Sequence, residues 1–153
     1  MTRKGLRVST CCLVFCSLAA LLAAQGRPFR LQGLSGGSLE AADLSRGVHI
    51  AVVFASWSPR GKDVVDQANQ IHDRWGSQAR VILINFQEER SEVEAFLSGK
   101  SPKATVYLDL DGSFSKRYSV THLPGLLILK DGTAAFSGRL TKDSDAVISQ
   151  TLG

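Results

Sequence analysis

Cysteine, serine and histidine are the residues of this 153-residue chain that could act as nucleophiles or general bases. All three cysteines lie near the N-terminus, at Cys11, Cys12 and Cys16, so the chain carries no thiol after residue 26. Attack on a disulfide requires a thiolate. We therefore expect no thiol–disulfide exchange from the region that follows residue 26.

Ser58 is the serine to consider as a nucleophile, because it follows an apolar run and precedes Pro59. A nucleophilic serine needs a base and oxyanion donors, but the chain has no G-x-S-x-G motif. Its histidines, His49, His72 and His122, have no recognisable acid partner and form no spaced ligand cluster. We therefore interpret Ser58 as a helix N-cap with Pro59 at the first helical position, and we expect no metal or cofactor.

Residues 1–26 differ in composition from the rest of the chain. Three basic residues and no acid precede an apolar run from Val8 to Ala24, and small residues follow it. These are the parts of a secretory signal peptide, and the run is short for a membrane span. We expect a signal peptide over 1–26, with an uncleaved membrane anchor as the alternative. Residues 27–153 would then form one exported domain, either periplasmic or extracellular.

The net charge of the chain, +4 at pH 7, is concentrated in its first residues. Three of the 18 basic residues and none of the 14 acidic ones precede residue 27, so the remainder is almost neutral. That remainder contains no block of lysine and arginine interleaved with aromatic residues. The composition therefore excludes a nucleic-acid-binding surface of the usual kind.

Two apolar, β-branched runs, His49–Ala55 and Arg80–Phe86, have the length and composition of strands buried on both faces. Between them, apolar residues recur at helical spacing as far as Trp75. A strand, a helix and a second strand form a right-handed crossover, which makes the two strands parallel. The sequence therefore predicts a parallel pair at the centre of a sheet.

A second helix is indicated by the capping-box spacing of Ser91 and Glu94, and the acidic run from Glu88 is interpreted as its solvated first turn. The other predicted elements are a strand over Ala104–Leu108, a short helix over Ser113–Tyr118, strands over Leu126–Lys130 and Thr133–Ser137 joined by the Asp131–Gly132 turn, and a closing helix over Thr141–Leu152. This order predicts an α/β fold, with a mixed sheet flanked by helices on both faces.

Two short segments add a family resemblance. Residues 55–61, ASWSPRG, are similar to the W-C-x-x-C turn of the thioredoxin-like superfamily, with Ser58 and Gly61 in place of both cysteines. Residues 120–124, VTHLP, resemble the segment that ends in the family's cis-proline, here Pro124. The inserted strand and helix favour the TlpA/ResA, peroxiredoxin-related type. The resemblance implies a thioredoxin-like fold from Pro28 to Gly153.

The departures from the family pattern bear on function. A serine hydroxyl stays protonated even at a helix N-terminus and has no redox couple, so Ser58 cannot replace the first cysteine in chemistry. Gly61 removes the second thiol. Val52 stands where thioredoxin has a buried acid that helps to deprotonate that thiol. The resemblance therefore implies a degenerate site without catalytic residues.

The same resemblance implies a binding face on which a polypeptide or partner protein could pair with residues 120–124, here called the proline loop. Its residues are Trp57, Ser58, Pro59, Arg60, Leu123 and Pro124. We expect a non-redox protein- or peptide-binding module such as a chaperone or assembly factor. Two alternatives stay open, a thiol–disulfide oxidoreductase, as in TlpA/ResA proteins, and a structural domain with a vestigial groove.

Two side-chain questions at this face also stay open. Trp57 is as compatible with an exposed contact as with a packed ring, because its motif position favours the former and its size the latter. Arg60 and Lys62 could attract an anionic partner, but ordinary solvated charge is the favoured interpretation from sequence.

Overall fold

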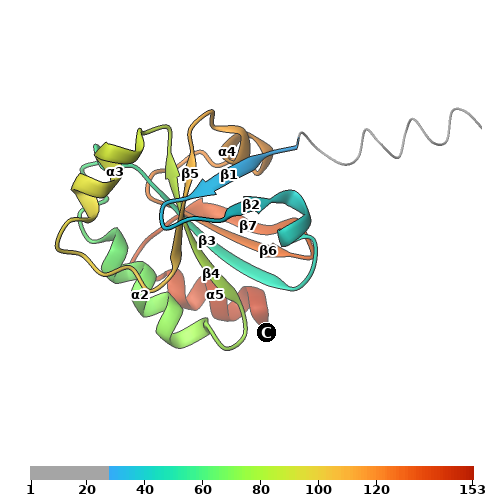
Figure 1. The fold of residues 1–153 in the computed structure, drawn as a ribbon. Coiled ribbons are helices and arrows are strands. Elements are labelled where there is room, and N and C mark those ends of the chain that lie inside the picture. The colour runs from blue at the N-terminus through green and yellow to red at the C-terminus, as the bar shows by residue number, and fades with distance from the viewer. Residues whose placement is uncertain (1–27) are drawn as a thin grey trace, which may run out of the picture.

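The computed structural model describes residues 28–153. Seven strands form one mixed sheet, and helices lie against both of its faces (Figure 1). This confirms the predicted α/β, thioredoxin-like architecture. The predicted leader, residues 1–26, lies outside the described residues. Within 28–153, no helix is both long enough and apolar enough to cross a membrane.

The sheet has the strand order β2-β1-β5-β4-β3-β6-β7. The strands are β1 (Arg30–Gly33), β2 (Ser38–Glu40), β3 (Val48–Phe54), β4 (Arg80–Phe86), β5 (Thr105–Asp109), β6 (Gly125–Lys130) and β7 (Thr133–Arg139). The helices of the described range are the 3-10 helix η1 (Ala41–Leu44) and the α-helices α2 (Val64–Trp75), α3 (Arg90–Leu97), α4 (Ser113–Arg117) and α5 (Ser144–Leu152).

The centre of the sheet is the parallel arrangement of β3, β4 and β5. The predicted pairing is confirmed, with Ile50 of β3 beside Val81 of β4. On its other side, β3 pairs in antiparallel fashion with β6. Because β3, β4 and β5 run in the same direction, their C-terminal ends meet at one edge, and the loops that follow them lie together there.

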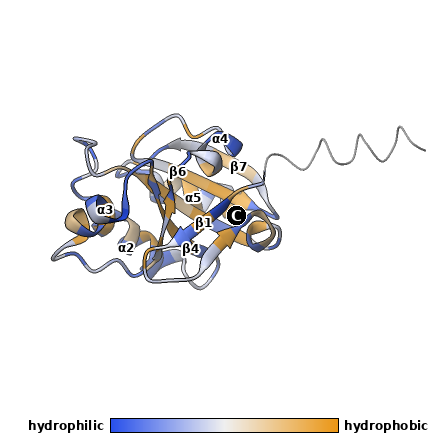
Figure 2. Ribbon diagram, turned by 45° about the horizontal axis from the view of Figure 1, so that its top comes forward, coloured by the Kyte–Doolittle hydropathy of each residue, from blue (hydrophilic) through white to orange (hydrophobic). Residues whose placement is uncertain are grey.

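Both faces of the central strands are buried, which explains their continuous apolar composition. One core cluster joins Val52 of β3 to Val64 and Ile71 of α2. The other joins Val53 to Phe114 of α4 on the opposite face. Figure 2 shows hydrophobic colour along much of the central strands and hydrophilic or neutral colour on many of the loops around them. This two-sided core holds the strand ends, and therefore the loops at them, in fixed positions.

Helix α2 begins at Val64, so Ser58 is not its N-cap and Pro59 is not its first residue, contrary to the prediction. Between Ser58 and Val64 the chain makes two separate single turns. The Gly61 N–H donates to the Ser58 carbonyl at 2.9 Å, and the Val64 N–H donates to the Gly61 carbonyl at 3.1 Å. Glycine inside a helix costs about 1 kcal/mol relative to alanine, which disfavours a continuous helix through Gly61.

Helix α3, in contrast, begins earlier than predicted, at Arg90. Its capping pair is Glu89 and Glu92, because the Glu89 N–H donates to Glu92 Oε2 at 2.9 Å. The predicted pair of Ser91 and Glu94 is therefore wrong by two residues. A glutamate suits this place because a carboxylate is stabilised near the positive end of the helix dipole.

Candidate functional site

The turn that follows β3 places Trp57 on the surface and Ser58 beneath it. The Trp57 side chain is 63% exposed, and within 28–153 the only other exposed large hydrophobic residue is Leu110. Ser58 is buried, whereas Pro59 and Arg60 are exposed. The structure therefore decides the question left open by the sequence in favour of an exposed tryptophan.

The proline loop lies directly against this turn. The Leu123–Pro124 peptide bond is cis, as the resemblance implied. The Ser58 hydroxyl donates a hydrogen bond to the Leu123 carbonyl at 3.2 Å, across 65 positions of sequence. The hydroxyl in place of the first cysteine thus joins the two segments that were expected to form the binding face.

Gly61, in place of the second cysteine, is buried beside the backbone of the same turn. A Cβ built on Gly61 would lie 3.2 Å from the Ala55 carbonyl oxygen and 3.3 Å from that of Ser58. A larger side chain here requires a shift of a few tenths of an ångström. Val52 is fully buried in β3, so it adds packing and no acid to the site.

A buried carboxylate supports the turn from below. Glu88 is only 5% exposed, which contradicts its interpretation as part of a solvated helix start. Its Oε2 accepts hydrogen bonds from the Ser56 N–H at 2.7 Å and from Asn85 Nδ2 at 2.6 Å. Its Oε1 accepts one from the Ser56 hydroxyl. A carboxylate with three such donors holds the backbone next to Trp57 in place.

The chain returns Glu88 to this position through a left-handed residue. Gln87 has a φ of 53°, in a region that non-glycine residues adopt at some cost. The Gln87 N–H donates to the Asp109 carbonyl at 3.1 Å, which ties the loop after β4 to the end of β5. Hydrogen bonds therefore link the loop after β3, which carries Trp57, to the loop after β4, and that loop to the end of β5.

The sequence contains one signal for the hydrogen-bonded cluster of Ser56, Asn85 and Glu88, although it lies within an apolar strand pattern. Asn85 is a polar residue in an otherwise apolar strand, and it is fully buried. A buried amide requires a partner, and Glu88 three residues later provides one. In the described range, Asn85 Oδ1 has no hydrogen-bond partner.

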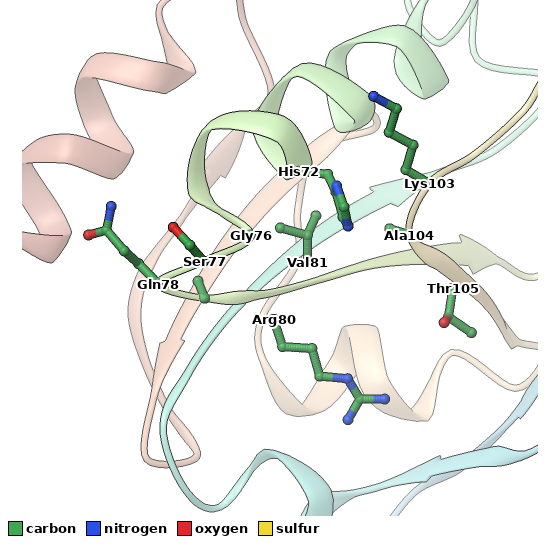
Figure 3. Close-up of a pocket in the computed structure, with 10 residues that line it drawn as sticks. His72, Gly76, Ser77, Gln78, Arg80, Val81, Lys103, Ala104 and Thr105 are labelled. Carbon is green, nitrogen blue, oxygen red and sulfur yellow. The ribbon is translucent and has the colours of Figure 1, made fainter.

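A hollow lies at the opposite end of the sheet, where His72, Arg80 and Lys103 contribute to its lining. The three side chains do not converge in Figure 3. Lys103 Nζ contacts both carboxylate oxygens of Asp73 at 2.6–2.7 Å, a bond that lowers the pKa of Asp73. Arg80 donates to the Tyr107 hydroxyl at 2.9 Å. The basic residues here are occupied in structural contacts.

Metal-binding side chains do not gather anywhere in the part of the chain that the structure describes. No group of three or more histidine, cysteine, aspartate or glutamate residues in 28–153 is placed to hold an ion. The histidines lie on separate elements, with His49 in β3, His72 in α2 and His122 in the proline loop. The site as the structure describes it consists of one exposed aromatic ring above hydrogen-bonded loops.

No family model matches the chain, and no curated protein sequence is significantly similar to it. Solved structures do match, and they define the class of fold. A Chlorobium tepidum protein bearing the name thiol:disulfide interchange protein DsbE has a TM-score of 0.71 at 21% identity, covering 84% of this chain and 95% of that one. The exposed lipoprotein thioredoxin Etrx1 of Streptococcus pneumoniae has a TM-score of 0.70 at 17% identity, covering 82% and 98%.

A secreted disulfide oxidoreductase of Mycobacterium tuberculosis is also similar, with a TM-score of 0.65 at 19% identity, covering 80% of this chain and 93% of that one. These likenesses show that the chain has a thioredoxin-like fold of the type found in DsbE-like and related proteins. The resemblance inferred from the two sequence segments is thus confirmed for the fold. The interchange and oxidoreductase activities belong to those named proteins.

Proposed function

We propose that this protein is an exported thioredoxin-fold module that binds a polypeptide without thiol chemistry. The face used is formed by exposed Trp57, Pro59 and Arg60 and half-buried Leu123, with Ser58 and Pro124 buried directly beneath them. The observation that carries the proposal is the combination of an exposed Trp57 with a proline loop that Ser58 bonds directly. Ser58 and Gly61 stand where the family motif has its two cysteines, whereas Trp57 and the cis-proline Pro124 match the family pattern.

The exposure of Trp57 supports a binding role. An exposed indole gives the core no packing, whereas a tryptophan at an interface can contribute more than 2 kcal/mol of binding free energy. The Glu88 cluster holds the backbone of Ser56, directly before Trp57. A contact residue held in place before binding loses less conformational entropy when its partner arrives. The site is therefore suited to binding in the form the structure shows.

The alternative is a thiol–disulfide oxidoreductase, and the names of the structural neighbours favour it. The residues of this chain oppose it, because Ser58 and Gly61 carry no sulfur and every cysteine lies in 1–26. A serine cannot form the mixed disulfide through which exchange proceeds. An oxidoreductase would need the thiols of the N-terminal segment.

Insulin-disulfide reduction separates these two functions. The full chain and a variant with Cys11, Cys12 and Cys16 all changed to Ala should both show no turnover above a protein-free control. Turnover by the variant would refute the non-redox proposal outright. Turnover only by the unchanged chain would assign redox chemistry to the N-terminal segment.

A photo-crosslinking residue at Pro59 tests the binding function. Pro59 is exposed beside Trp57, so a bound polypeptide should form a defined adduct that Trp57→Ala removes. A crosslinker at exposed Arg46, before the opposite end of β3, is the matched control. Repeated absence of a Pro59-specific adduct would favour the vestigial groove.

Export and the domain boundary at residue 27 form part of the same proposal. Two structural neighbours are named as an exposed lipoprotein and as a secreted protein, which supports an exported location. The composition of residues 1–26 supports removal of a leader. The N-terminal sequence of the protein purified from its native compartment tests this directly, and retention of Met1 in an envelope fraction would favour the anchor.

A further inference from the structure

Three exposed cations lie on the segments that form or adjoin the Trp57 face, which is the surface of the Trp57 turn and the proline loop. They are Arg60, Lys62 and Arg139, and none of them forms an ion pair or a side-chain hydrogen bond within 28–153. Their exposure and lack of partners leave their charges available to a ligand. The favoured sequence interpretation treated two of them as ordinary solvated charge, and it did not include Arg139.

The fold places these cations on two sides of the proline loop. Arg139 ends β7 opposite Gly125, and the neighbouring Leu140 N–H donates to the Pro124 carbonyl at 3.0 Å. Arg60 follows Ser58 by two residues, on the turn that bonds the Leu123 carbonyl. Positive charge therefore reaches the loop both from the turn before α2 and from the last strand of the sheet.

No acidic residue of the described range forms an ion pair with these cations. Glu88 is buried beneath the turn and is occupied by Ser56 and Asn85. Asp63 and Asp66 line a separate hollow beside α2 and the segment that leads into α5, to which none of the three cations contributes. The face around Trp57 therefore combines an exposed aromatic ring with cations that have no ion-pair partner in the described range.

We infer that the occupant of this face is an acidic, extended polypeptide segment, a conclusion that rests on the proposed binding function. Arginine suits carboxylates because its planar donors match both carboxylate oxygens. An apolar side chain of the segment would contact Trp57, while acidic residues on either side would reach Arg60 and Arg139. An extended segment fits because the loop adjoins β7, whose outer edge has no strand beside it within 28–153.

Fluorescently labelled peptide pools test the charge preference on the full chain. Each pool alternates apolar residues with glutamate, with glutamine or with lysine. The glutamate pool should bind about ten-fold more tightly than the glutamine pool at low ionic strength, which corresponds to two or three exposed ion pairs. The advantage should decrease in added salt, because salt screens exposed charges. The lysine pool should bind most weakly.

Charge reversals locate the effect. Arg139→Glu should weaken binding of the glutamate pool several-fold and leave the glutamine pool almost unchanged. Arg60→Glu changes a residue of the binding face, so it should weaken both pools, and the glutamate pool more. Arg46→Glu is the matched control, because Arg46 is also exposed but lies before the N-terminal end of β3. Circular dichroism of each variant checks that the fold is retained.

The outcomes distinguish this inference from the binding function beneath it. Equal affinity for the glutamate and glutamine pools would overturn the acidic preference and leave polypeptide binding intact. Absence of binding to every pool would overturn both. An equal loss from Arg46→Glu, or tighter binding to vesicles of anionic phospholipid than to the glutamate pool, would also overturn the inference.

Discussion

The two ends of the parallel strands use similar residue types in opposite ways. At the C-terminal end, Trp57 is 63% exposed and Arg60 has no ionic partner in the described range. At the N-terminal end, Trp75 is 8% exposed, its indole N–H donates to Asp145 at 2.7 Å, and Lys103 pairs with Asp73. The residue types alone would not separate a candidate site from ordinary structure.

The difference lies in whether each group already has a partner. A tryptophan and a lysine with internal partners contribute to the free energy of unfolding, whereas exposed groups without partners remain available for binding. Buried Glu88 has a different role, because its hydrogen bonds with Ser56 and Asn85 fix the loop beneath the exposed ring. The candidate site thus combines exposed side chains that have no internal partner with a buried set of hydrogen bonds that fixes the backbone beneath them.

Truncating the two tryptophans should give the largest contrast. Trp75→Ala should lower the free energy of unfolding by about 3–5 kcal/mol, because it empties a core position and leaves Asp145 without its indole donor. Trp57→Ala should change it by less than about 0.5 kcal/mol, as for most surface substitutions. Urea denaturation measures both. Similar losses would mean that Trp57 has a structural role, and the comparison would fail.

Removing the buried carboxylate should give the next largest effect. Glu88→Ala leaves the Ser56 and Asn85 donors without their acceptor and should cost about 2–3 kcal/mol of stability. Glu94→Ala, which removes an exposed partner of Arg90, is the matched control and should cost about 0.5 kcal/mol or less. Chemical denaturation compares the two variants. Equal costs would show that the Glu88 bonds do not support the turn.

The Ser58 hydroxyl should have a smaller effect on stability. Ser58→Ala removes the hydrogen bond to the Leu123 carbonyl and should cost about 1 kcal/mol. Ser101→Ala, at an exposed position, serves as control and should be neutral. Hydrogen exchange in the proline loop should also increase in Ser58→Ala. Unchanged protection there would contradict the view that this hydroxyl joins the two halves of the face.

Acid should produce the smallest effect on stability, through His49 near the N-terminal end of β3. Burial, together with the charge of Arg80, lowers the pKa of His49 from its ordinary value of 6.5, and Asp43 partly opposes this. As the pH falls below 6.5, the unfolded chain therefore takes up a proton before the folded one. The His49 contribution to stability is complete above pH 6.5 and decreases below it until the lower folded-state pKa is reached.

Urea denaturation on both sides of pH 6.5 checks this prediction. His49→Leu should remove this part of the pH dependence, whereas replacing half-buried His72 by Leu should retain it. An identical pH dependence in the native chain and His49→Leu would contradict the assignment.

The central strands and their pairing could be predicted because burial on both faces leaves a continuous apolar run, as in β4 (Arg80–Phe86). The cis-proline followed from the resemblance of residues 120–124. The start of α2 could not be placed, because Ser58 and Pro59 have ideal types for a helix start and the separate turns depend on Gly61 and on the contact with Leu123.

The burial of Glu88 was missed for a related reason. It depends on the left-handed conformation of Gln87 and on donors from another loop, neither of which a local charge pattern records. The free charge of Arg139 likewise becomes relevant only when β7 pairs with β6 beside the proline loop. Local patterns predicted the elements, whereas the composition of the site depended on tertiary contacts.

Trp57 itself provides the most direct measurement. In a full chain with Trp75→Phe and all three cysteines changed to Ala, Trp57 is the only tryptophan and no thiol remains. If the face binds acidic polypeptide, the glutamate peptide pool should shift the Trp57 emission to shorter wavelength and shield the ring from acrylamide quenching. Unchanged emission and quenching at saturating peptide, in a variant that remains folded, would contradict polypeptide binding at this face.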